Sequence, residues 1–153
     1  MNQSLETNPD QPAVENPEHI ALSNAIARMI NGETFEEPFS SGNWKISNEG
    51  KPKNSLEISS ADGKDSFDFT WKMENNEIIF ENTERTIDKA RLDDTLKMIN
   101  GALELFAKNR IRGVEIIFNN VPEGEMKTLL LGESYKGDGG QRFHKRIVKS
   151  NLK

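Results

Sequence analysis

The sequence predicts an α+β fold: an antiparallel meander of three or four strands plus one further strand, with helices packed on one face. Two patterns carry this prediction. Apolar and polar residues alternate from Ser66 to Met73, the period of a half-buried strand, and one apolar stripe runs along residues 92–106 at helical spacing. Strand signals precede that helix, and a strand and a further helix follow it. This order is typical of α+β domains.

The amino-terminal part predicts a disordered acidic leader and then a helix. Residues 1–17 contain three prolines among mostly polar residues, so this segment buries too little apolar surface to offset its ordering entropy. From Glu18 to Asn31 apolar residues recur at spacings of three and four, and Gly32 stands where a carboxyl-terminal cap is expected. This helix either packs on the core or is presented to a partner.

The meander is predicted after a connection over residues 33–43. Strand character is found at residues 44–46, 55–60, 66–73 and 77–81. Asp62-Gly63 and Asn75-Asn76 predict tight hairpin turns, because the central residues of such turns favour positive φ. One face of the strand over 66–73 is expected to carry Phe67, Phe69, Trp71 and Met73.

The start of the next helix stays open, since four residues could cap it: Thr86, Asp88, Asp93 and Asp94. Gly101 lies inside this helix, where glycine costs about 1 kcal/mol relative to alanine, which indicates close packing on the sheet. A buried strand is predicted at residues 114–118. Pro122 then suits the first turn of a last helix.

Residues 137–140 are Gly-Asp-Gly-Gly, which we interpret as a flexible linker into a basic tail. The predicted organisation is therefore a leader over 1–17, a single domain over 18–136, and a linker and tail over 137–153. The length of 153 residues suits one domain with polar flanks.

The formal net charge of −5 conceals an asymmetry. Residues 141–153 carry five basic residues and no acid, so the other 140 residues together carry −10. Such asymmetry is typical of interaction tails, and a tail folded back on the acidic body is the alternative. We interpret the tail as a partner-binding element and expect its deletion to leave the core folded. Its candidate residues are Arg142, Phe143, Lys145, Arg146, Ile147 and Lys149.

The sequence gives no candidate catalytic, cofactor-binding or metal-binding residue. It contains no cysteine, and its two histidines, His19 and His144, lie near opposite ends of the chain. Acid–base and metal sites need such side chains to converge on a scaffold. Acidic pairs such as Asp93-Asp94 stand at predicted helix starts, where carboxylates favour the helix dipole. We therefore predict a chain that is not an enzyme and needs no cofactor.

Residues from about Asp62 to Tyr135 show short strands, the helix TLKMINGALELFAK (95–108), the strand VEIIF (114–118) and a further helix. This succession resembles the large polyvalent protein-associated domain found with relaxases of plasmids and phages. The chain departs from that family in having no nicking domain, and its only tyrosine is Tyr135. The resemblance implies an accessory or targeting module near conjugation or type IV secretion.

Our first hypothesis is a protein–protein interaction module, acting as a translocated effector, adaptor or regulator linked to type IV secretion or mobile elements. The alternative is a nucleic-acid-binding accessory protein that uses the basic tail. Aromatic residues on strands, such as Trp44 and Trp71, could stack bases, but their alternation also suits a core face. No stretch approaches the roughly 20 apolar residues of a membrane span. We expect a cytoplasmic protein, or one translocated without a cleaved signal peptide.

Overall fold

The computed structural model describes residues 16–109 and 113–148, and within them three α-helices accompany a sheet of eight strands. The helices are α1 (Pro17–Ile30), α2 (Leu92–Lys108) and α3 (Glu125–Gly132), with a 3₁₀ turn, η1 (Lys89–Arg91), before α2. The strands are β2 (Phe39–Ser41), β3 (Trp44–Ser47), β4 (Ser55–Ser60), β5 (Ser66–Glu74), β6 (Glu77–Thr86), β7 (Val114–Phe118), β8 (Lys136–Gly137) and β9 (Phe143–Ile147). The α+β class is confirmed, with more strands than expected.

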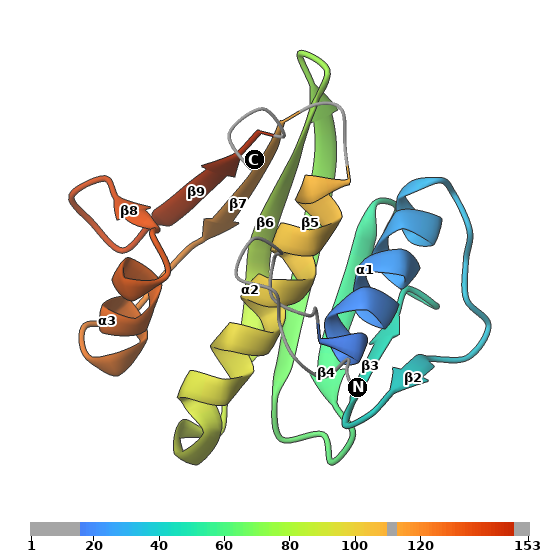
Figure 1. The fold of residues 1–153 in the computed structure, drawn as a ribbon, viewed down its shortest axis with the longest axis horizontal. Helices are drawn as coiled ribbons and strands as arrows, with labels where there is room; N and C mark the ends of the chain where they lie inside the picture. The colour runs from blue at the N-terminus through green and yellow to red at the C-terminus, as the bar shows by residue number, and fades with distance from the viewer. Residues whose placement is uncertain (1–15, 110–112, 149–153) are drawn as a thin grey trace, which may run out of the picture.

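The sheet has the order β2-β3-β4-β5-β6-β7-β9-β8. Its neighbouring strands are antiparallel except β6 and β7, which run parallel from the pair Ile78–Val114 to the pair Asn82–Phe118. A parallel pair needs a long crossover connection, and α2 supplies it. Figure 1 shows α1 and α2 side by side over the same face of the sheet, whereas α3 stands near β8.

The core lies between that face and the two helices. Phe67 and Phe69 of β5 are fully buried and meet Phe118 of β7 edge to face, with ring centroids 6.4 and 5.9 Å away. Phe80 of β6 packs against Phe106 of α2 in the same way, at 5.5 Å. The predicted aromatic face and helical stripe therefore form the two sides of one core. Met73 is the exception, because its side chain is 52% exposed near the tip of the β5–β6 hairpin.

The two predicted hairpin turns differ. Asn75 and Asn76 both have positive φ, at 52° and 66°, as the shortest hairpins require. Between β4 and β5 only Gly63 has positive φ, at 77°. That connection is a longer loop. Within it, the Asp62 carboxylate accepts hydrogen bonds from the N–H of Lys64 and the hydroxyl of Ser60.

Helix α1 packs on the core instead of standing free. Leu22 and Ile26 are fully buried, and Asn16 caps the helix by accepting the N–H of Glu18 at 2.7 Å. Gly101 of α2 explains the close approach of the two helices, since a Cβ there would lie 2.1 Å from Cε1 of His19. The close contact predicted for Gly101 is therefore with α1 and not with the sheet.

Three strands lie wholly or partly in segments that the sequence predicted as a connection, a linker and a tail. Residues 39–41, expected within a connection, form β2 at one edge of the sheet. The predicted linker and tail over 137–153 is wrong for its described part, because Gly137 belongs to β8 and residues 143–147 form β9. In β9 the apolar residues Phe143 and Ile147 are buried while Lys145 between them pairs with Glu104. Because Lys145 occupies the central inward-facing position of β9, the sequence of this strand lacks the alternation of apolar and polar residues by which a strand is recognised.

Some predictions fall partly or wholly outside the described residues. The predicted leader over 1–17 is described only at its end, where α1 begins at Pro17. Lys149 of the predicted partner-binding set also lies outside the described residues. In the described part of the chain, no helix combines the length and apolarity needed to cross a membrane.

Candidate binding cleft

A cleft opens where the parallel strands β6 and β7 part. Their pairing ends at Asn82 and Phe118, after which β6 continues to Thr86 while the chain leaves β7 through Asn119 and Asn120 toward α3. The cleft between these segments has a volume of about 880 Å³. Its walls are the end of β6, the connection into α2, and residues 120–126 at the start of α3.

A local irregularity accompanies this parting on each side, one in β6 and one after the end of β7. The register of β5 and β6 shifts between Asp68 and Phe69, so Thr83 is an extra residue in β6. The amide of Asn82 holds this bulge by donating to the carbonyls of Asp68 at 2.9 Å and Glu84 at 3.0 Å. On the other side, Asn120 adopts positive φ, at 56°, and turns the chain away from the sheet.

Arg85 bridges the two diverging walls. Its Nη1 donates to Oδ1 of Asn82 at 2.8 Å and to the carbonyl of Asn119 at 2.7 Å. Its Nη2 donates to the carbonyl of Asn120 at 2.6 Å. All three acceptors are neutral, and within the described ranges no carboxylate pairs with this guanidinium. Partial burial without a counter-charge lowers the pKa of Arg85 below its usual range, although the group stays charged.

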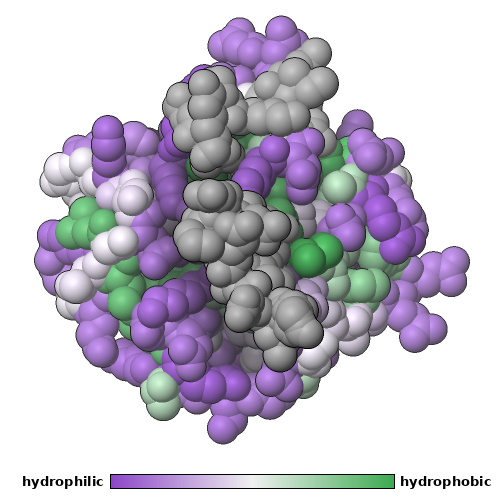
Figure 2. All heavy atoms as spheres, viewed as in Figure 1, coloured by the Kyte–Doolittle hydropathy of each residue, from purple (hydrophilic) through white to green (hydrophobic). Residues whose placement is uncertain are grey.

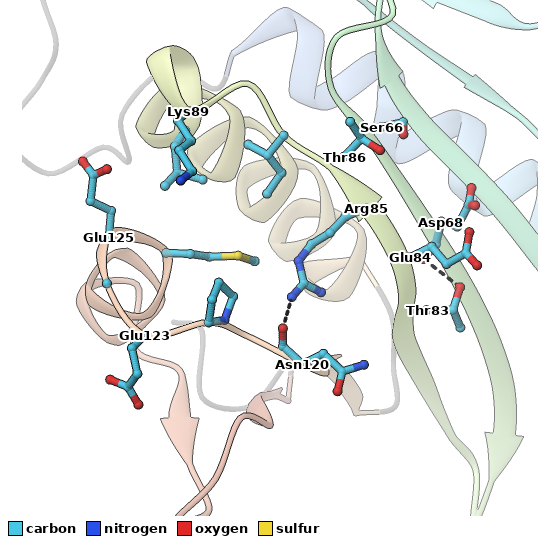
Figure 3. Close-up of a pocket in the computed structure, with 15 residues that line it drawn as sticks. Ser66, Asp68, Thr83, Glu84, Arg85, Thr86, Lys89, Asn120, Glu123 and Glu125 are labelled. Atoms are coloured by element: carbon cyan, nitrogen blue, oxygen red, sulfur yellow. Dashed lines mark hydrogen bonds between the residues drawn. The ribbon is translucent and has the colours of Figure 1, made fainter.

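A second cation and an apolar floor complete the cleft. Figure 3 shows Lys89 reaching toward the same space as Arg85, whereas Glu123 and Glu125 point away from it. Glu84 and Asp68 also line the cleft, and Asp68 is already paired with Lys51 at 3.0 Å. The floor consists of Ile87, Leu92, Pro122 and Met126.

The end of β6 also presents free backbone to the cleft. Residues 83–86 lie beyond the last pair with β7, so on that side they have no strand partner among the described residues. Unpaired strand edges are the groups to which an added strand can bond. The cleft thus combines a backbone edge, two cations, four carboxylates and an apolar floor.

The groups of the cleft that could take part in catalysis are carboxylates and hydroxyls. Its lining offers hydroxyls from Ser66, Thr83 and Thr86 but no histidine, so no activated nucleophile of the serine–histidine type is formed there. No group of three or more histidine, aspartate or glutamate residues in the described chain could hold a metal ion.

The predicted partner-binding residues that the structure describes lie elsewhere: Arg142 directly precedes β9, and Phe143, Lys145, Arg146 and Ile147 belong to it. Phe143 and Ile147 are buried in the core, with 2% and 5% exposure. Arg142 pairs with Asp138 at 3.2 Å, Lys145 pairs with Glu104, and Arg146 pairs with Glu77 through a hydrogen bond that lowers the pKa of this carboxyl. The basic segment therefore folds back on the acidic body. A role of these residues in partner binding stays a prediction.

The aromatic residues considered as a base-stacking platform belong to the core. Trp44 and Trp71 are each 8% exposed, and Phe67 and Phe69 are fully buried. Where the described residues form the helix-bearing face, hydrophilic side chains dominate and apolar areas are small and separate (Figure 2). This arrangement leaves the cleft as the site with the most distinctive chemistry.

Sequence reasoning missed Arg85 and Lys89. Both lie in the segment 83–92, whose structure the local pattern left open. Arg85 follows the sequence alternation of β6 and looks like any exposed cation on a strand. The available signal was the three cations Arg85, Lys89 and Arg91 in the strand-to-helix segment 83–92, and it gains meaning only once β7 is known to run parallel to β6.

Comparison with known proteins gives little further information. No family model and no curated protein matches the chain. Among solved structures, it is similar to the N-terminal domain of ribosomal-protein-alanine acetyltransferase from Clostridium acetobutylicum ATCC 824, with a TM-score of 0.47 and 13% sequence identity. The match covers 75% of this chain and 98% of that one. A likeness at this level carries no argument about function.

Proposed function

We propose that this chain is a non-enzymatic protein-binding module whose cleft receives an extended segment of a partner protein. The observation that carries the proposal is the free edge of β6 over residues 83–86 beside a cleft of about 880 Å³. A peptide that adds a strand to such an edge gains backbone hydrogen bonds, and neighbouring side-chain pockets give selectivity. Here the floor with Leu92 and Met126 would receive one of the peptide's apolar side chains.

A role as effector, adaptor or regulator fits this module. The support is the resemblance of residues 62–135 to the polyvalent-protein-associated domain, which implies an accessory position near conjugation or type IV secretion. A module that recognises an extended segment suits such a position, because it can select a partner without changing it chemically. The partner is therefore proposed to be a protein.

The first test fills the cleft. Thr86 is exposed at the end of β6 and lines the cleft, so Thr86→Trp places a large ring where the peptide would lie. We expect randomised short peptides selected on the unchanged protein to lose binding to this variant. Hydrogen exchange should also show that the selected peptides protect those backbone amides of residues 83–86 that face the cleft, because these amides then gain a strand partner.

Two matched variants control this test. Thr34→Trp makes the same substitution on an exposed loop and should bind like the unchanged protein. Arg142→Ala removes an exposed cation beside β9 and tests the earlier prediction for the basic segment. If Arg142→Ala lost binding while Thr86→Trp retained it, the β9 surface would replace the cleft as the binding site.

The nucleic-acid alternative has less support, because Arg142, Lys145 and Arg146 are each neutralised by an acid of the same chain. Both tryptophans are also buried. We expect single-stranded DNA to leave the tryptophan fluorescence unchanged at low salt. Quenching that disappears as salt is added would indicate the opposite, because phosphate contacts are salt-dependent.

A further inference from the structure

The donors of Arg85 that remain free point to one class of ligand group. A guanidinium has five N–H donors in a fixed plane. Three are used, two from Nη1 and one from Nη2, on Asn82, Asn119 and Asn120. The Nε–H and the second Nη2–H form no hydrogen bond with the described residues. These two point outward from one edge of the guanidinium, within its plane, at the spacing that binds both oxygens of a carboxylate.

The surroundings of that free side include a second cation. Figure 3 shows the guanidinium in the gap between β6 and Asn120, with its side chain directed into the cleft. Lys89 extends toward the same space, and the ion pairs of the neighbouring turn involve Arg91 and not Lys89. Two cations that form no ion pair with the described residues therefore border a partly apolar cavity, whose lining also includes the carboxylates of Asp68, Glu84, Glu123 and Glu125. Attraction between such cations and an anion is stronger there than in open water.

Resting on the proposed function, we propose that the cleft selects a carboxylate of the bound peptide, which Arg85 holds with two hydrogen bonds while Lys89 supplies a second positive charge. The three existing bonds of Arg85 fix its plane, so little freedom is lost on binding. Met126 and Pro122 line the cavity beside this position. They would receive an apolar side chain next to the carboxylate.

A peptide carboxylate has two sources, its own carboxyl terminus and an aspartate or glutamate side chain. Three sets of randomised short peptides separate them. The first has free carboxyl termini and no acidic residue, the second has amidated termini and no acidic residue, and the third has amidated termini and one internal glutamate. We expect the first or the third set to bind, and peptides of the second set to bind at least about tenfold more weakly.

Protein variants then locate the interaction. Arg85→Gln keeps N–H donors but loses the charge and the fork, and should weaken carboxylate binding at least about tenfold. Its melting temperature shows whether the loops at Asn119 and Asn120 remain in place. Lys89→Ala removes only an exposed cation and should weaken the same binding, whereas Lys53→Ala, an equal charge change on another loop, should leave it intact.

The outcomes distinguish this inference from the proposed function. Equal affinity for amidated and carboxylate-bearing peptides, unchanged in Lys89→Ala, would overturn carboxylate selection while the cleft remained a peptide site. If the protein bound peptides from none of the three sets, peptide binding itself would be overturned, and the carboxylate inference with it.

Discussion

A chain shortened to residues 1–140 is expected to lose its cooperative unfolding transition. The truncation removes β9, which forms five residue pairs with β7 and places Phe143 and Ile147 in the core. Burying each of these side chains contributes about 1.5–3 kcal/mol, and the ladder and the ion pair between Lys145 and Glu104 are lost as well. Small domains have only about 5–15 kcal/mol in total, so the remaining fold should be marginal.

Circular dichroism during heating measures this effect. A chain shortened to residues 1–148 retains all of β9 and is the matched control, expected to melt like the full chain. The sequence led to the opposite expectation, a dispensable tail over 137–153. Cooperative melting of the 1–140 chain within a few degrees of the control would restore that expectation. It would show that β9 contributes little to the stability of the fold.

Replacing Asp65 by alanine should destabilise the protein by about 3–5 kcal/mol, because it removes one partner from a buried charged network. The Asp65 side chain is fully buried. Its carboxylate accepts the N–H of Asp88 at 2.6 Å and the Thr95 hydroxyl at 3.0 Å, and pairs with Arg91 at 2.8 Å. Alanine leaves three donors without this acceptor and loosens the connection between β5 and the start of α2.

Urea unfolding at neutral pH tests this prediction, with an unchanged slope showing that only stability has changed. Asp62→Ala is the matched control, since Asp62 also pairs with Arg91, at 3.0 Å, but is about half exposed.

A hydrogen bond from the Lys64 N–H, with others from Ser60 and Arg91, lowers the pKa of Asp62 well below its usual range. Its contribution is therefore present at neutral pH and fades as the pH falls through the folded-state pKa. Equal losses in both variants would contradict a special role for burial of Asp65.

Most of the fold could be predicted because it follows from local periodicity. The two-residue period of β5 and the helical period of the apolar stripe in α2 each repeat several times within their own element. The two elements form the two sides of the core in the structure. The missed strands lack that repetition. β2 has three residues, β8 has two, and β9 hides its alternation behind Lys145.

The cleft could not be predicted in the same way. It depends on β7 running parallel to β6 and then turning away at Asn120, and the local pattern of residues 114–118 is the same for either strand direction. Arg85 likewise gains its role from the carbonyls of Asn119 and Asn120, which lie more than 30 residues along the chain. Long-range pairing, and not residue type, creates this site.

The short outer strands of the sheet have a consequence for the protein at high concentration. An exposed strand edge is a template on which a second copy can pair and begin an aggregate. Here the sheet ends in β2 and β8, of three and two residues, which offer few backbone groups to another molecule. Beyond β8, the outer part of β9 carries Lys145 and Arg146, and charges at an edge also disfavour such pairing. The outer edges of the sheet are thus poorly suited to pairing with a second copy. The edge of β6 over residues 83–86, on the side of β7, is left open.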